Sequence, residues 1–169
     1  MADTFYAVTK FVHVLAAALW IGAGVFNVFV IQRLLATAAP ETRRDFGART
    51  FVATMKYLNA MGGLTIASGF VLLYRHPNPM SGLTSSTWGK LVLAGILLSF
   101  AVLYLINFAI RPTMKAIGKI TAQLPADLPP PVNVRFLLAR VRITSIFNVV
   151  LMVATFGLMI GANVLYFGP

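Results

Sequence analysis

Apolar residues dominate four long stretches of the chain, which cover about residues 5–35, 51–73, 88–110 and 143–167 and are separated by polar segments. Each stretch is long enough to cross a hydrocarbon layer of about 30 Å, which takes roughly 20 helical residues. None alternates apolar and polar residues as a membrane-barrel strand does. Because backbone groups in lipid must be hydrogen-bonded within their own segment, the pattern predicts an all-α, integral membrane four-helix bundle in a single domain, residues 1–169.

The composition supports this interpretation. Hydrophobic residues make up 59% of the chain and charged residues only 11%, whereas a soluble domain carries about 25% charged residues. The formal charge of +10 comes from basic residues that cluster between the apolar stretches, which is typical of membrane topology and of contact with membrane lipids rather than nucleic acid. The absence of cysteine excludes disulfides and iron–sulfur clusters.

The basic residues also predict the orientation. Loops 36–50 and 111–142, with the adjoining ends of the apolar stretches, hold eleven of them: Arg33, Arg43, Arg44, Arg49, Lys56, Arg111, Lys115, Lys119, Arg135, Arg140 and Arg142. The opposite side holds three, Lys10, Arg75 and Lys90. The positive-inside rule therefore places both loops in the cytoplasm and both termini on the outer, periplasmic side of a bacterial inner membrane.

The third polar segment, residues 111–142, contains a proline cluster, PADLPPP at residues 125–131, that cannot continue a helix. The segments on either side of it, around 114–120 and 134–141, are expected to extend the third and fourth helices into the cytoplasm.

The first apolar stretch carries His13, the only ionisable side chain between Phe11 and Gln32. An imidazole inside a membrane span is costly and therefore marks a candidate functional site. His13, Trp20 and Asn27 are spaced by seven residues and fall on roughly one helix face, with the small residues Ala16 and Gly24 nearby. We expect this face to pack against protein.

The predicted topology brings His13, Arg75, His76 and Lys90 to the outer half of the bundle. A neutral imidazole is a good axial ligand for haem iron, so His13 is the candidate metal ligand, with His76, Lys90, a methionine or nothing as the second. Arg75 or Lys90 would pair with the haem propionates, and Trp20 would line the cofactor pocket. The same inventory would instead hold copper through His13, His76 and Met80.

Structural interpretations compete with each of these roles. His13 would serve equally as a hydrogen bond between helices, His76 as an exposed residue of a His-Pro-Asn-Pro turn, and Lys90 beside Trp88 as an interfacial anchor. Asn59, Asn107 and Asn148 are expected to cap or bridge helices on the inner side. The glycine-rich helix faces favour a homo-oligomer or a place in a larger membrane complex.

Three segments resemble a known family. KFVHVLAAALWIGAGVF at 10–26, TWGKLVLAGILL at 87–98 and RVRITSIFNVV at 140–150 are similar to the corresponding helices of the HemJ-like and CopD-like superfamily of small bacterial membrane proteins. In HemJ-like proteins the first-helix histidine binds haem b and the third-helix lysine is functionally required, which implies a cofactor role for His13 and a catalytic role for Lys90. The family's Asn-Glu-Xaa-Pro motif is absent here, because Val149 follows Asn148.

The sequence thus leads to one main functional hypothesis and two alternatives. The first is an inner-membrane haem b protein that acts in electron transfer or haem-dependent oxidation, alone or within a larger complex. The resemblance implies an oxidoreductase of the protoporphyrinogen oxidase kind. The alternatives are a CopD-like copper-handling protein and a structural or assembly subunit without cofactor. No buried acidic residue suggests proton relay, and no serine or carboxylate dyad accompanies the histidine.

Overall fold

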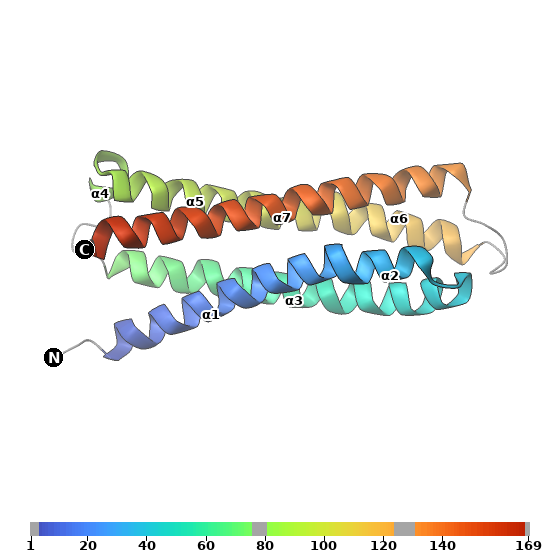
Figure 1. Ribbon diagram of the computed structural model, residues 1–169, viewed down its shortest axis with the longest axis horizontal. Helices are drawn as coiled ribbons and strands as arrows, with labels where there is room; N and C mark the ends of the chain where they lie inside the picture. The colour runs from blue at the N-terminus through green and yellow to red at the C-terminus, as the bar shows by residue number, and fades with distance from the viewer. Residues whose placement is uncertain (1–3, 76–80, 124–130, 168–169) are drawn as a thin grey trace.

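The computed structural model describes residues 4–75, 81–123 and 131–167, and all the regular structure in them is helical. Four long helical segments run side by side along the molecule (Figure 1). The first consists of α1 (Thr4–Phe26), η1 (Asn27–Ile31) and α2 (Gln32–Thr37), and the second is α3 (Pro40–Tyr74). After the short α4 (Ser81–Ser85), the third consists of α5 (Thr87–Tyr104), η2 (Leu105–Ile110) and α6 (Arg111–Ala122), and the fourth is α7 (Val132–Phe167).

The four segments form an up-and-down bundle. The start of α1, the end of α7 and α4 lie at one end of the molecule, while the turn from α2 to α3 and the ends of α6 and α7 that face each other lie at the other (Figure 1). Each long segment contains a stretch long and apolar enough to cross a membrane. Large apolar side chains remain exposed along all four, for example Phe11 at 66% and Phe108 at 70%. The protein is therefore built as a multi-pass membrane protein.

The helix boundaries differ from the predicted loops. Residues 36–50 were expected to be a loop, but α3 begins at Pro40 and only Ala38 and Ala39 separate it from α2. A proline restricts the preceding residue to extended conformations while fitting the first turn of a helix itself, so the break is confined to two residues. Residues 111–142 were also expected to be a loop, yet α6 and the first turns of α7 are helical there, as the suggested extensions required. Most of the proline cluster lies outside the described residues.

The bundle consists of two antiparallel pairs, α1 with α3 and α5 with α7. Gly62 of α3 receives the indole ring of Trp20, and Gly95 of α5 receives the side chain of Met159. The absence of a Cβ at these glycines lets the helix axes approach closely. The core lies where the two pairs meet, and its most buried members are Val102, Ile106, Val134 and Met152.

Candidate functional site

His13 lies on the face of α1 that packs against α3. Its Nδ1 is 2.8 Å from the backbone carbonyl oxygen of Thr65 and 3.2 Å from Oγ of Ser68. Since a carbonyl oxygen only accepts hydrogen bonds, the short contact requires that Nδ1 carry the proton and donate it. The neutral imidazole then has its proton on Nδ1, and its Nε2 keeps a free lone pair.

Glycine at position 69 makes this arrangement possible. A Cβ there would lie 2.9 Å from Cε1 of His13 and 3.3 Å from Nδ1, closer than carbon atoms normally pack. The hydroxyl of Ser68 meanwhile donates to the carbonyl oxygen of Leu64 at 2.6 Å. It is thus turned toward its own helix and can accept a weak second bond from the histidine. Thr65, Ser68 and Gly69 of α3 together fix both the tautomer and the ring position of His13.

The predicted common face of His13, Trp20 and Asn27 is confirmed as a protein-packing face. The three residues contact α3 at successively earlier positions: His13 meets Ser68, Trp20 meets Gly62, and Asn27 donates a long bond of 3.5 Å to Oγ1 of Thr54. The small residues on this face are buried too, with Ala16 only 2% exposed. The seven-residue spacing therefore marks the contact face between the antiparallel helices α1 and α3, which is called the α1–α3 seam below.

Trp20 has a polar atom without a partner. The side chain is 2% exposed, and its Nε1 makes no hydrogen bond within the described part of the chain. A buried indole N–H normally finds an acceptor, because leaving it unpaired costs about 1–3 kcal/mol. This orphaned donor lies on the same seam as the free Nε2 of His13.

The other predicted site residues do not surround His13 in the described part of the structure. Lys90 is exposed on the first turn of α5, where its backbone N–H donates to the carbonyl oxygen of Ser86. Arg75, just after α3, is also exposed and places its guanidinium carbon 4.9 Å from the ring centre of Phe5. Both therefore lie at the end of the bundle where α1 begins, away from the Thr65–His13 bond. His76 and Met80 lie outside the described residues.

No cluster of three or more His, Cys, Asp or Glu side chains able to hold a metal ion occurs within residues 4–75, 81–123 and 131–167. The copper alternative requires several protein ligands, whereas haem iron requires only one or two axial ligands because the porphyrin supplies the others. His13 is the one histidine among the described residues, since His76 lies outside them.

Comparison of the chain with family models, curated proteins and solved structures finds no match. The resemblance to the HemJ-like and CopD-like superfamily therefore stays a prediction. Any function assigned to this chain depends on the geometry of its own residues, above all those around His13.

A second polar contact, which joins the two helix pairs, was only partly anticipated. Nδ2 of Asn107, in η2, donates to Oδ1 of Asn59 in α3 at 2.7 Å and also to the carbonyl oxygen of Leu103 at 2.9 Å. The expectation that Asn59 and Asn107 bridge helices is confirmed. For Asn148 the structure shows that the buried Oδ1 has no hydrogen-bond partner among the described residues.

Replacing Asn59 and Asn107 by alanine, singly and together, is expected to reveal this bond as a coupling energy. Hydrogen bonds between membrane helices contribute about 0.6 kcal/mol on average and up to about 1.7, and the short distance favours the upper part of that range. Unfolding free energies in mixed detergent would give the double-mutant cycle. Fully additive effects would contradict a direct contribution of the bond.

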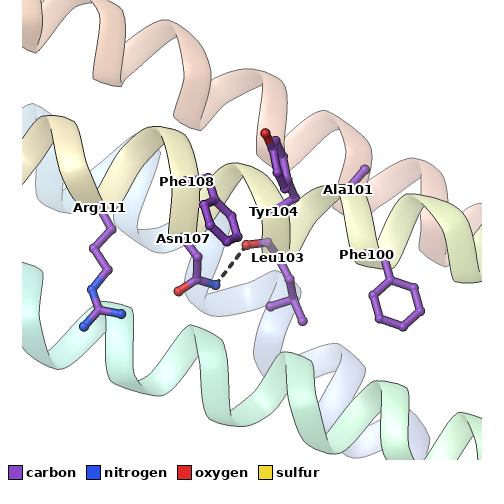
Figure 2. A pocket seen from close by; sticks show the side chains of 7 residues that line it. All are labelled: Phe100, Ala101, Leu103, Tyr104, Asn107, Phe108 and Arg111. Atoms are coloured by element: carbon purple, nitrogen blue, oxygen red, sulfur yellow. Dashed lines mark hydrogen bonds between the residues drawn. The ribbon is translucent and has the colours of Figure 1, made fainter.

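A wide groove of about 740 Å³ lies beside Asn107 on the surface of α5, η2 and α6 (Figure 2). Three of its seven lining residues are aromatic, and Tyr104 stacks on Phe108 with ring centres 5.0 Å apart. Arg111 lies at one end of the groove. None of the predicted site residues lines it. Because Tyr104 and Phe108 are more than 60% exposed, the groove lies on the outer surface of the bundle.

Proposed function

We propose that the protein is a multi-pass inner-membrane protein that binds one haem b through Nε2 of His13 and serves in electron transfer or haem-dependent oxidation. The observation that carries the proposal is the bond from Nδ1 of His13 to the Thr65 carbonyl oxygen. Metal-binding histidines almost always donate their other ring N–H to a carbonyl or carboxylate, which fixes the tautomer and makes the free nitrogen a better ligand.

Two further features of the chain support the proposal. The indole N–H of Trp20, buried without an acceptor, offers a hydrogen bond to an acceptor on a bound group. Arg75 and Lys90, at the end of the bundle where α1 begins, supply the positive charge that propionates require. When bound, haem supplies one-electron chemistry, and its potential depends on the axial ligand and on the apolar surroundings.

Each protein residue has a defined task in this proposal. Thr65 and Ser68 hold the imidazole in one tautomer and one orientation, and Gly69 leaves space for the ring. Lys90 is the candidate catalytic residue, which the family resemblance suggests.

The basic ends of α2, α3, α6 and α7 face the cytoplasm, so that His13 lies nearer the outer surface. Anionic lipids contact these basic ends. The protein forms a homo-oligomer or is part of a larger membrane complex.

The test is the visible absorption spectrum of the purified protein, oxidised and then reduced with dithionite, after expression in haem-replete cells. We expect a Soret band and b-type reduced bands in the wild type. Both should be lost in His13→Gln, because the amide can still donate a hydrogen bond to the Thr65 carbonyl but cannot replace imidazole as an iron ligand.

A second variant separates ligation from packing. His13→Gly creates space for added imidazole, which should restore the b-type spectrum if His13 is the ligand. Ser68→Ala, which leaves the histidine and its main hydrogen bond in place, should weaken haem binding by about 10-fold, the lower end of the range for residues that orient a metal ligand. A colourless wild type would refute haem binding. A coloured His13→Gln protein would assign the iron ligand elsewhere and leave His13 as a contact between helices.

A further inference from the structure

A small cavity of about 20 Å³ lies where all four long segments meet. Gly24 of α1 with Asn27 and Val28 of η1 forms one side of it, and residues of α3, η2 and α7 line the others. The residues that line it are mainly apolar. Three carry polar side chains: Asn27, Ser145 and Asn148. A cavity holds a water molecule when it offers at least about 10–15 Å³ and polar partners, so this one has room for a single water.

One polar atom in the lining of the cavity has no hydrogen-bond partner. Asn148 is only 4% exposed, and its Oδ1 makes no hydrogen bond among the described residues. Asn27, by contrast, is already engaged, since its Oδ1 accepts from Nε2 of Gln32 at 3.2 Å. An unpaired amide oxygen in a membrane interior costs several kcal/mol. A hydrogen-bond donor in the cavity would remove that cost.

Two irregularities of the helices occur at the same place. The N–H of Gln32 donates to the carbonyl oxygen of Asn27 in η1, and the N–H of Arg111 donates to that of Ile106 in η2, each across five residues instead of four. Both accepting residues, Asn27 and Ile106, line the cavity. π-helical turns are rare and frequently mark functional positions, and water often accompanies breaks in the regular helix ladder. Two such turns on different helices meet at one cavity, whose lining includes three polar side chains.

We infer that this cavity is a binding site for one water molecule, which donates to Oδ1 of Asn148 and joins the two π-helical turns at the centre of the bundle. A metal cation is disfavoured, because the polar lining is neutral and no acidic side chain contributes to it. A bare cation there would lack a counter-charge in a low-dielectric interior. The inference is independent of haem binding, because neither His13 nor its hydrogen-bond partners Thr65 and Ser68 line the cavity.

Two methionines in the lining of the cavity can report whether a water molecule is bound there. Met55 and Met152 line it, yet they are only 9% and 1% exposed. X-ray radiolysis converts water into hydroxyl radicals, which oxidise a methionine next to a bound water even when bulk solvent is excluded. The detergent-purified full chain would be irradiated in ¹⁸O-water and digested, and incorporation at each methionine measured by mass spectrometry. Met114, which is partly buried on α6 close to several basic residues, is the positive control, and Met159, which is partly buried against Gly95 and does not line the cavity, is the negative control.

We expect label on Met152 in the wild type and its fall to background in Asn148→Leu. Thr155→Val is the matched control, because it removes another buried hydroxyl of α7 that already has its own partner, the carbonyl oxygen of Leu151 at 2.8 Å. That variant should keep the label. Helix content and unfolding temperature would verify that each variant folds.

If Asn148→Leu does not fold, Gly24→Ala provides the test for the bound water. Its added Cβ would reduce the cavity and lie 3.0 Å from Sδ of Met152, the flexible part of that side chain, while every polar group is retained. Label on Met152 should again fall to background. An unlabelled wild-type Met152 beside a labelled Met114, or label that persists in both cavity variants, would overturn the inference.

Discussion

A Gly62→Ala variant is expected to be less stable than the wild type by about 1–3 kcal/mol, the usual cost of forcing an extra carbon into a packed core. The new Cβ would lie 2.7 Å from Cε2 and Cζ2 of Trp20 and 2.9 Å from Cδ2 of Leu103. The indole is rigid and only 2% exposed, so it cannot move aside without disturbing the α1–α3 seam. Thermal or denaturant unfolding in detergent would measure the loss.

The adjacent glycine provides the control. Gly63 has no atom within 4 Å of its would-be Cβ, so Gly63→Ala meets no steric obstacle and improves the intrinsic helix preference, by up to about 1 kcal/mol in water. We expect this variant to be at least as stable as the wild type. Equal losses at positions 62 and 63 would contradict the close approach of α1 and α3 at Trp20.

The second large effect is expected for Trp20→Ala. Removing a buried tryptophan typically costs about 3–5 kcal/mol, because the surrounding side chains do not close the cavity completely. Unfolding measurements under the same conditions would give the value. Trp20→Phe should cost less, because it keeps most of the ring volume and removes the unpaired indole N–H.

Combining Trp20→Ala with Gly62→Ala tests the cause directly. Two of the three close contacts of the new Cβ are with the indole ring, so the alanine at position 62 should cost much less when the ring is absent. The two substitutions are expected to be non-additive by about 0.5–3 kcal/mol, as for residues in contact. Strict additivity would mean that Gly62 matters for a reason other than the tryptophan.

Much of the fold was predictable from local features of the sequence. Apolar length and the lack of acidic residues predict four membrane helices, because lipid leaves the backbone almost no other choice. The spacing of His13, Trp20 and Asn27 predicts the buried face of α1, because helical periodicity alone determines which side chains share a face. The helix ends were predicted less well. Polar residues outside the membrane continue α3 and α6 as helices, and hydropathy does not distinguish a polar helix from a loop.

The candidate site was predictable only at its centre. His13 is conspicuous in the sequence because an imidazole is costly in a membrane span. Its partners Thr65, Ser68 and Gly69 are not, because serine, threonine and glycine are common in packed membrane helices. The roles of Arg75 and Lys90 depend on which helix ends lie together, and the structure leaves both exposed at the end of the bundle rather than beside the histidine.

The sequence by itself determined the number of spans, the buried face of the first helix and the one residue most costly to place there, since each depends on local spacing and on the solvent. Only the tertiary structure decided that the Thr65 carbonyl selects the tautomer of His13. It also decided that Asn59 meets Asn107 and that Oδ1 of Asn148 does not find a partner among the described residues. These outcomes depend on the relative height and rotation of packed helices, which a shift of one residue would change without altering the hydrophobic pattern.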